Sequence, residues 1–458
     1  MNPLAPSPRR LAAAAVAAAL AISACTSGGA TDAKPTPRLS QPTQPRPATQ
    51  TPLAAYSATA PAPTTVGLGN VLLGPLADTR LGPGVGLRVV DVATGRTLFD
   101  RLAATPVPPA STLKLLTAVA ALRVLGPDRR LTTTTKQVGN TVVLVGGGDP
   151  TLAGPHSVAR YPAAAKLSEL ARLTAAALGP KARVQVAVDE SLFAGPRTGV
   201  GWKPNYVPDG DVAPVSALEL DGARLRPDDN PKTPDPRASD AALHAGGVFV
   251  SMLRARGVVV VGALKKAGAS TTSARQLASV SSAPMSELVE GMLSRSDNDL
   301  AEALARHIAI QTHRPPTFEG GAAAITQAVA GLGVTGVVLH DASGLSVLDR
   351  VTPDELVEVV MLAAGERYPE LRPVISGLPV AGFSGTLEKR FASARPARGL
   401  VRAKTGTLTG VSTLAGTLVT VEGRLLAFAA TAPHAPTTKQ AQLGLDRLLS
   451  VLVGCGCR

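Results

Sequence analysis

The sequence predicts a mixed α and β protein that follows an export signal and a proline-rich segment. Strand-like runs occur near both ends of the predicted folded part, at 86–100 and 400–430. Long Ala- and Leu-rich runs with helical spacing lie between them. A hydrophobic content of 45% is ample for a core, and an aromatic content of only 3% means that Leu, Val and Ala must fill it.

The first residues are typical of an export signal. Arg9 and Arg10 precede an apolar stretch at 11–24, which is shorter than the roughly 20 residues of a membrane span. The stretch ends in Ile22-Ser23-Ala24-Cys25, which resembles a bacterial lipobox. We therefore expect a signal peptide at 1–25, a lipid anchor at Cys25 on the outer face of the cell membrane, and an exported protein. Ordinary cleavage nearby, with a cysteine there by chance, is the alternative.

Residues 26–66 are predicted to be a disordered linker, because they are rich in Pro, Thr, Ala and Ser and cannot bury enough surface to fold. The folded part should begin near Val66. Two of the three cysteines, Cys455 and Cys457, fall in a short tail at 454–458. The folded part itself therefore needs no internal disulfide, and the role of the two terminal cysteines stays open.

Within the folded part the elements follow in order from composition and periodicity. A strand pair surrounds a turn at 93–96, a helix starts at Ser111, and residues 285–311 read as two helices with a polar interruption. The remaining predicted elements are strands at 131–135, 141–145, 184–188, 400–404, 411–421 and 424–430, and helices at 163–178, 241–256, 322–332 and 353–364, followed by a terminal helix.

The charge pattern argues against nucleic-acid binding. The net charge of +13 comes from 46 basic and 33 acidic residues, but it is spread along the chain without a Lys/Arg block or an RNP-like motif. Attraction to an anionic wall polymer is compatible with it. The six histidines show no metal-ligand spacing, so we expect neither a metal nor another cofactor.

Ser111 and Lys114 are three positions apart at the start of an apolar helix, so their side chains share a face. Taken alone, this pattern favours an N-cap serine and a lysine whose stem lies along apolar surface. A catalytic pair makes a stronger demand: a serine needs a base, and a lysine with a pKa of about 10.4 is neutral in only about one molecule in 2,500 at pH 7. Burial among leucines lowers such a pKa.

Two further polar motifs follow. Ser296-Asp297-Asn298 interrupts two helices, where it can aim a hydroxyl and an amide into a cleft or merely cap the second helix. Lys404-Thr405-Gly406-Thr407 ends a predicted strand. There the lysine and hydroxyls can bind a carboxylate, the glycine can let a ligand approach the backbone, or the strand end can simply be solvated.

Together, Ser-x-x-Lys, Ser-x-Asn and Lys-Thr-Gly in this order resemble the motifs of the penicillin-recognising serine peptidases. The 185 positions between Ser111 and Ser296 are similar to those of the D-alanyl-D-alanine carboxypeptidase/endopeptidase family, the low-molecular-mass class C penicillin-binding proteins. The resemblance covers roughly residues 66–453. It includes "GGGDPTL" at 146–152, "APVSAL" at 213–218, "HDASGLS" at 340–346 and "LPVAGFSGTL" at 378–387.

The resemblance implies a fold of the β-lactamase/transpeptidase type: an antiparallel sheet flanked by helices, an all-helical part, and an α/β insertion domain between the first two motifs. We expect the catalytic domain at 67–149 and 266–453 and the insertion at 150–265. The insertion is shorter than in well-known members, so the presence of a nested third domain stays open.

The resemblance also implies the site. Ser111 attacks the carbonyl between two D-alanines, and Lys114 accepts its proton. Ser296 relays a proton to the leaving amine, and Asn298 holds Lys114 and the substrate amide. Lys404 lowers the pKa of Lys114 and steers the terminal carboxylate, which the Thr405 and Thr407 hydroxyls bind around Gly406.

The implied activity is that of an exported serine D-Ala-D-Ala carboxypeptidase acting on peptidoglycan stem peptides and acylated by β-lactams. Endopeptidase cleavage of cross-links uses the same chemistry, so the balance between the two activities stays open, as do the stem-peptide preference and the oligomeric state. A β-lactamase and an inactive wall-binding lipoprotein are the alternatives. Glu319 lacks the asparagine four positions later that a class A β-lactamase requires.

Overall fold

A computed structural model of the chain describes residues 56–227, 236–268 and 274–456. The predicted signal peptide, Cys25, most of the predicted linker and Cys457 lie outside these ranges. Cys455 is buried in the core and disulfide-bonded. Among the helices in the described ranges, none is long and apolar enough to cross a membrane.

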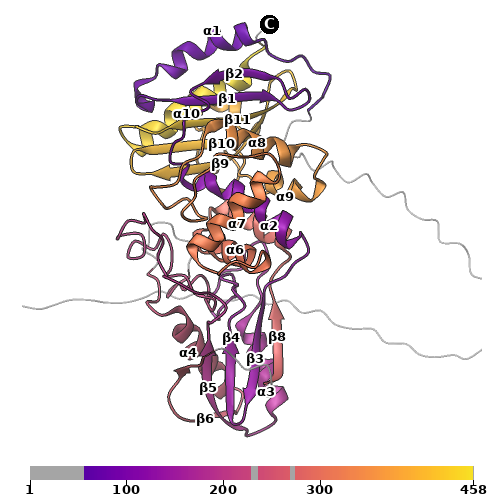
Figure 1. Ribbon diagram of the computed structural model, residues 1–458, viewed down its shortest axis with the longest axis vertical. Helices are drawn as coiled ribbons and strands as arrows, with labels where there is room; N and C mark the ends of the chain where they lie inside the picture. The colour runs from indigo at the N-terminus through magenta and orange to yellow at the C-terminus, as the bar shows by residue number, and fades with distance from the viewer. Residues whose placement is uncertain (1–55, 228–235, 269–273, 457–458) are drawn as a thin grey trace, which may run out of the picture. The chain divides into compact units, whose positions relative to one another are not determined.

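Five antiparallel strands form the first sheet, in which both ends of the described chain take part (Figure 1). Its strand order is β2-β1-β11-β10-β9, so the N-terminal hairpin pairs with the C-terminal strands. The strands are β1 (Gly86–Asp91), β2 (Thr97–Arg101), β9 (Val401–Leu408), β10 (Val411–Val419) and β11 (Leu425–Ala432).

Two different cores cover the two faces of this sheet. Side chains alternate along a strand, and in β11 the residues Phe428 and Ala430 pack with α1 (Thr65–Leu76) and α10 (Thr438–Gly454). Ala427 and Ala429 point the other way, into a core built from helices. Because both faces are covered, every residue of β10 is buried, and β11 is apolar apart from Thr431.

The helical core surrounds α2 (Lys114–Leu125), in which every side chain from Lys114 to Leu122 is buried. A helix that is buried all round has no polar face, and its one ammonium group must therefore find partners inside the protein. The helices around α2 are α5 (Met285–Arg295), α6 (Asn298–Gln311), α7 (Phe318–Ala330), α8 (Pro353–Ala364) and α9 (Arg372–Ser376).

A second sheet is mixed, with the order β6-β5-β4-β3-β8 and β7 paired to β5. β3 pairs antiparallel with β4 and β8, whereas β5 runs parallel to β4, β6 and β7. Helices α3 (Leu167–Leu178) and α4 (Ala241–Arg254) pack on it. The strands are β3 (Thr132–Val138), β4 (Thr141–Val145), β5 (Arg183–Asp189), β6 (Val259–Val260), β7 (Lys265–Lys266) and β8 (Arg275–Ser281).

The second sheet takes strands from both flanks of the segment predicted as the insertion, 150–265. β3 and β4 precede that segment and β8 follows it, although the sequence prediction placed these residues in the catalytic domain. A strand is assigned to a domain by its hydrogen-bonded neighbours, which the sequence does not show. We infer that the inserted unit begins at β3 and ends with β8.

The N-terminal boundary also differs from the expectation. The Ser57 N–H donates to the carbonyl of Gly423 at 2.9 Å, and Arg424 donates to the carbonyl of Ala60 at 3.0 Å. Arg424 is held in turn by Asp91 of β1. The last part of the predicted linker, from residue 57 on, therefore packs against the first sheet, and the folded part begins about nine residues before Val66.

Between β5 and α4, the described residues 190–227 and 236–240 contain no helix or strand, although Arg224 and Arg237 form an isolated bridge. The described part of this segment contributes the Asp211 carbonyl and the Trp202 indole, which bind Asn298 and Asp341 in the site below. Short 3₁₀ turns complete the chain: η1 (Thr79–Leu81), η2 (Ala110–Leu113), η3 (Pro369–Leu371), η4 (Gly385–Leu387) and η5 (Arg395–Ala397).

Two leucines of α10 test the core on the outer face of the first sheet. Leu448 is 0% exposed, whereas Leu443 in the same helix is 38% exposed. We expect Leu448→Ala to lower the free energy of unfolding by about 3 kcal/mol, because a cavity is left, and Leu443→Ala to lower it by less than about 1 kcal/mol. Denaturant unfolding of both variants measures the difference, and equal losses would contradict this packing.

Candidate active site

Ser111 lies on the 3₁₀ turn η2, directly before α2. The preceding Ala110 has φ of 49°, a left-handed conformation that is costly for a residue with a Cβ. The turn is held by the Pro109 carbonyl, which accepts hydrogen bonds from Thr112 Oγ1 at 2.6 Å and from Thr413 Oγ1 at 2.9 Å. The predicted helix at Ser111 is thus present, but its first turn is tighter than an α-helix.

Two glycines make room for this turn. A Cβ at Gly406 would lie 2.0 Å from Thr413 Oγ1 and 2.6 Å from the Pro109 carbonyl oxygen. A Cβ at Gly344 would lie 1.9 Å from the Ala110 carbonyl oxygen. The sequence analysis explained Gly406 by the approach of a ligand. In the structure the space beside its Cα is filled by the Thr413 hydroxyl and the Pro109 carbonyl, so that Gly406 lets β9 pack against the serine turn.

The Lys114 amine is completely buried and has three hydrogen-bond partners from three parts of the chain. Its Nζ lies 2.9 Å from Ser111 Oγ, 2.6 Å from Asn298 Oδ1 and 2.6 Å from the Ser343 carbonyl oxygen. The residues predicted from the first two motifs therefore meet, although Ser111 and Asn298 are far apart in sequence. The Ser343 carbonyl is a partner that the sequence analysis did not identify.

Burial lowers the pKa of Lys114 to about 8, against the opposing effect of the carboxylates of Asp341 and Glu302. A neutral amine has two N–H donors and one lone pair. With the two donors directed at Asn298 and Ser343, the lone pair is left for the hydroxyl proton of Ser111. The arrangement can therefore take a proton from the serine, which is what a nucleophilic hydroxyl needs.

The Ser296-Asp297-Asn298 motif forms the junction between α5 and α6. Ser296 ends α5 in a left-handed conformation with φ of 60°, and Asn298 begins α6. Asp297 caps α6 by accepting a hydrogen bond from the Leu300 N–H at 2.9 Å. For this residue the structure therefore shows the helix-capping role that the sequence analysis gave as the alternative. The Asn298 amide also donates to the Asp211 carbonyl at 2.9 Å, which fixes its orientation.

Lys404 is also completely buried, in the middle of β9. Its Nζ donates to Ser296 Oγ at 2.9 Å and to the Thr405 carbonyl at 2.8 Å. Burial, and then the positive charge of Lys114, hold the pKa of Lys404 well below its ordinary value. The resemblance implied that Lys404 lowers the pKa of Lys114. In the structure the charge of Lys114 lowers the pKa of Lys404, whereas burial is the main cause of the low pKa of Lys114.

The two threonines of the third motif differ in their surroundings. Thr405 Oγ1 lies 2.8 Å from Thr386 Oγ1, and Thr407 is exposed. Thr386 belongs to the "LPVAGFSGTL" stretch, which the sequence analysis noted without assigning a role to any of its residues. Both threonines lie on β9, the strand that carries Lys404, and no ion pair joins the buried Lys404 amine to an acidic side chain of the described residues.

Two buried carboxylates hold the loop that carries the Ser343 carbonyl. Glu302, one turn after Asn298 on α6, accepts the N–H groups of Ala342 and Ser343 at 3.0 and 2.9 Å. Asp341 accepts the Gly344 N–H at 2.8 Å and the Trp202 indole N–H at 2.8 Å. Asp341 and Ser343 lie in the "HDASGLS" stretch, to which the sequence analysis assigned no roles, and no motif pointed to Glu302. The roles of these residues depend on contacts between distant segments.

These features define the class. A buried lysine against a serine hydroxyl, between an antiparallel sheet and a helical core, is the arrangement of the penicillin-recognising serine peptidases. A sequence model of the D-Ala-D-Ala carboxypeptidase 3 (S13) family matches residues 72–234 and 224–451.

Relatives agree with this match. The chain is 40% identical to carboxypeptidase DacB of Mycolicibacterium smegmatis over 91% of this chain and 90% of that protein. It is 30% identical to the D-alanyl-D-alanine carboxypeptidase of Actinomadura sp., over 74% and 76%. The structure of penicillin binding protein 4 (dacB) from Haemophilus influenzae has the same fold, with a TM-score of 0.69 and 21% identity over 85% of this chain and 99% of that one. The chain belongs to the D-Ala-D-Ala carboxypeptidase 3 (S13) family.

The buried amine predicts a characteristic pH dependence of stability. The pKa of Lys114 is about 8 in the folded protein and 10.5 ordinarily, so between these values the unfolded chain binds more protons and stability rises with pH. Lys114→Met should remove about 3 kcal/mol of this rise in the free energy of unfolding, as an order of magnitude. Denaturant unfolding at pH values from about 8 to 10.5 measures it.

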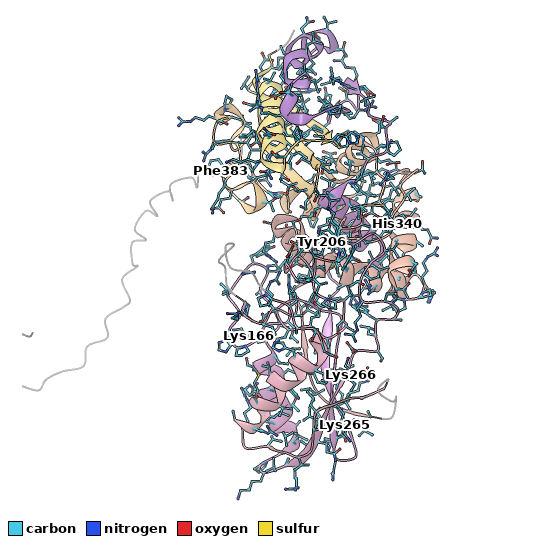
Figure 2. The ribbon with its side chains drawn as sticks, turned by 90° about the vertical axis from the view of Figure 1, so that its left-hand side faces the viewer. Lys166, Tyr206, Lys265, Lys266, His340 and Phe383 are labelled. Atoms are coloured by element: carbon cyan, nitrogen blue, oxygen red, sulfur yellow. The ribbon has the colours of Figure 1, made fainter. Side chains whose placement is uncertain are left out.

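Lys265→Met is the matched control, because the Lys265 side chain is exposed on β7 of the second sheet (Figure 2). This variant should keep the pH dependence of the wild-type protein. An unchanged pH dependence in Lys114→Met would show that the amine is charged in the folded protein.

Proposed function

We propose that the protein is a serine D-Ala-D-Ala carboxypeptidase that removes the terminal D-alanine from peptidoglycan stem peptides through an acyl-enzyme. The observation that carries the mechanism is the 2.9 Å contact between Lys114 Nζ and Ser111 Oγ in a place where burial lowers the pKa of the amine to about 8. Family membership supports the substrate, a peptide that ends in D-Ala-D-Ala.

In the acylation step, neutral Lys114 accepts the proton of Ser111 while Oγ attacks the carbonyl carbon of the penultimate D-alanine. An ester forms, the amide C–N bond breaks, and the departing amine of the terminal D-alanine takes a proton. Ser296 relays that proton, since its hydroxyl is bonded to Lys404 at 2.9 Å, and Lys404 is close enough to Lys114 for the charge of Lys114 to lower the pKa of Lys404. Water then hydrolyses the ester and releases the shortened peptide.

The terminal carboxylate of the substrate supplies the counter-charge that Lys404 lacks. A carboxylate placed beside this amine favours its charged form and so raises its pKa. The Thr405 and Thr407 hydroxyls donate to the same carboxylate. We assign the stabilisation of the developing oxyanion to the backbone N–H groups of Ser111 and Thr407, each worth a few kcal/mol in well-studied hydrolases.

A β-lactam acylates the same serine, because its strained amide carbonyl takes the place of the substrate carbonyl and its carboxylate takes the place of the terminal carboxylate. The proposed substrate is a wall polymer, so we place the protein outside the cytoplasm. A lipid anchor at Cys25 is part of this proposal and is tested by mass spectrometry of the N-terminal peptide of the mature protein.

Ser111→Ala tests the nucleophile. Loss of the hydroxyl should abolish labelling by a fluorescent penicillin and reduce the release of D-alanine from a muropeptide pentapeptide by at least about 10⁴-fold, measured by mass spectrometry. Ser251→Ala, an exposed serine on α4, should retain both activities.

The same assay separates the alternatives. Retained D-alanine release in Ser111→Ala would overturn the assignment, and rapid hydrolysis of a chromogenic cephalosporin would point to a β-lactamase. A cross-linked muropeptide dimer, offered beside the pentapeptide, measures any endopeptidase activity on the same serine.

Glu302→Gln tests the base. The carboxylate of Glu302 favours the ammonium form of Lys114, so replacing it with a neutral amide should lower the pKa of Lys114 further below about 8. The rate of penicillin acylation rises with pH as Lys114 loses its proton. We therefore expect this rise to move to lower pH, by up to about one pH unit.

The glutamine Oε1 can still accept the two loop N–H groups, while the change also removes the negative charge that faces Arg306 at 3.5 Å. Glu319→Gln, an exposed glutamate at the start of α7, is the control and should leave the profile in place. If the profiles of Glu302→Gln and the wild-type protein coincide, Glu302 does not act on Lys114.

A further inference from the structure

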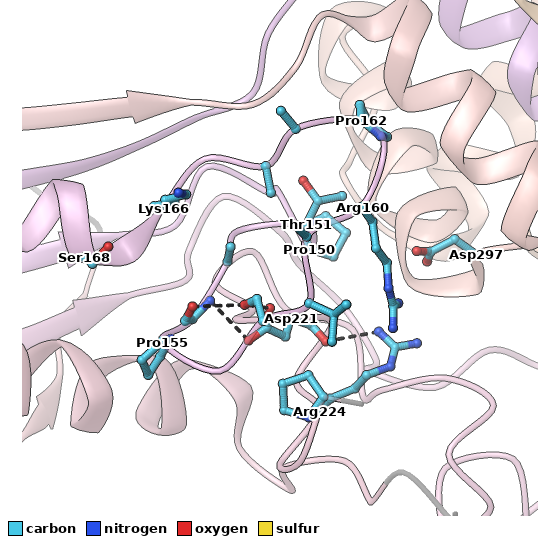
Figure 3. A pocket seen from close by; sticks show the side chains of 18 of the residues that line it. Pro150, Thr151, Pro155, Arg160, Pro162, Lys166, Ser168, Asp221, Arg224 and Asp297 are labelled. Atoms are coloured by element: carbon cyan, nitrogen blue, oxygen red, sulfur yellow. Dashed lines mark hydrogen bonds between the residues drawn. The ribbon is translucent and has the colours of Figure 1, made fainter. Parts of the chain in front are cut away.

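A pocket of about 490 Å³ is lined by Asp297 of the Ser296-Asp297-Asn298 loop, and its described lining does not include Ser111, Lys114 or Lys404. Figure 3 shows this pocket from close by. Asp297 lines it, whereas its neighbours Ser296 and Asn298 bind Lys404 and Lys114. The remaining described lining comes from the segment 150–168, which connects β4 to α3, and from Asp221, Arg224, Pro227 and Arg295. None of these residues takes part in the proposed reaction.

Positive charge exceeds negative charge among the described residues that line this pocket. Four of them are basic, and two, Asp221 and Asp297, are acidic. Both carboxylates are already engaged by the protein: Asp221 accepts the Gly154 N–H at 3.1 Å, and Asp297 caps α6. The basic residues are Arg160, Lys166, Arg224 and Arg295.

Three of the arginines are close enough to act on one another. Burial lowers the pKa of Arg295; the charge of Asp297 opposes that shift, and the charges of Arg160 and Arg224 reinforce it. Figure 3 shows the side chains of Arg160 and Arg224 extending into the same part of the pocket, on the side where Asp297 lies. Guanidinium groups gathered in this way bind carboxylate and phosphate oxygens well, because they present several N–H donors in a fixed plane.

The size and the apolar part of the lining favour an organic anion over an inorganic one. The volume is in the range of sites for small organic ligands, and it is far larger than one inorganic ion requires. Much of the wall is formed by the small apolar side chains of proline, alanine and valine, which contribute nothing to binding an inorganic ion. These residues are Pro150, Ala153, Pro155, Val158, Ala159, Pro162, Ala163, Ala164 and Pro227.

We propose that this pocket binds the carboxylate end of a D-alanyl peptide, at a site separate from the one that Ser111 serves. The arginines bind the carboxylate, and the alanine methyl groups pack against the proline and alanine wall. The need for an organic anion follows from the pocket; the choice of a D-alanyl peptide rests on the proposed function.

Ligand binding in this pocket affects the Ser296-Asp297-Asn298 loop through the charge of Asp297. Burial raises the pKa of Asp297, and the charges of Arg224 and Arg295 outweigh that effect and hold it below its ordinary value. A bound carboxylate competes for the same two guanidinium groups. The junction between α5 and α6, which positions Ser296 and Asn298, therefore responds to whether the pocket is filled.

Calorimetric titration with D-alanyl-D-alanine tests the proposal, using full-length protein whose Ser111 has first been acylated with benzylpenicillin. The dipeptide should still bind, and D-alanyl-D-alanine amide should bind at least about tenfold more weakly, because it lacks the carboxylate.

The variant Arg160→Ala should bind the dipeptide at least about tenfold more weakly than the wild-type protein does. Arg160 is exposed, so this change should leave the fold intact. Arg101→Ala, an exposed arginine on β2, is the matched control and should bind as the wild-type protein does.

Four results would overturn the proposal: no binding to the acylated protein, equal binding of the amide, equal binding to Arg160→Ala, or inorganic phosphate binding as tightly as the dipeptide. The last result would show a site for simple oxyanions only. Failure of penicillin to acylate Ser111 is seen before the titration begins and contradicts the proposed function alone. In that case the titration is made on Ser111→Ala, where the effect of Arg160→Ala still reports on the pocket.

Discussion

The removal of one amine from water is the interaction on which the site depends. Lys114 is the first residue of a helix that is buried all round, and no solvent reaches its Nζ. An ammonium group in such a place is costly, so the chain surrounds it with a hydroxyl, a side-chain amide and a backbone carbonyl from three separate segments. Each of these segments must be in place before the amine can be buried and can also accept the proton of Ser111.

The sheet, the helix junction and one loop supply the groups that surround the Lys114 amine and the serine turn. The first sheet carries Lys404, and its glycine at 406 admits the serine turn. The junction of α5 and α6 supplies Asn298, and the loop fixed by Glu302 and Asp341 supplies the Ser343 carbonyl. The cost of burying these carboxylates is visible in their own equilibria. Burial, followed by the charge of Asp341, raises the pKa of Glu302 to about 7. Asp349, which accepts the His340 N–H at 2.7 Å next to this loop, is also buried, and burial followed by the charge of Asp341 raises its pKa to about 10.

The elements that local chemistry determines could be predicted from the sequence. The helix at 353–364 was predicted with its observed bounds, since Thr352 and Glu355 form a capping box around Pro353. The helix expected at 322–332 begins earlier, at Phe318, because Thr317 caps it by accepting a hydrogen bond from the Gly320 N–H. The family predicted from the three motifs is confirmed.

The features that the sequence does not predict depend on contacts between residues that are far apart in the chain. The left-handed Ala110, the filled space beside Gly406, the role of Glu302 and the membership of β3 and β8 in the second sheet all depend on partners far along the chain. The direction of the coupling between the lysines also depends on how deeply each amine is buried, and sequence spacing does not report that depth.

The order of strands in the first sheet has a consequence for the timing of activity. β1 and β2 are made early, yet β1 pairs with β11, and β9 with its lysine comes near the end of the chain. A growing polypeptide that has reached residue 400 holds its serine and its base but neither the strand beside them nor the sheet that carries it. The site is therefore complete only after the C-terminal strands have joined β1 in the sheet.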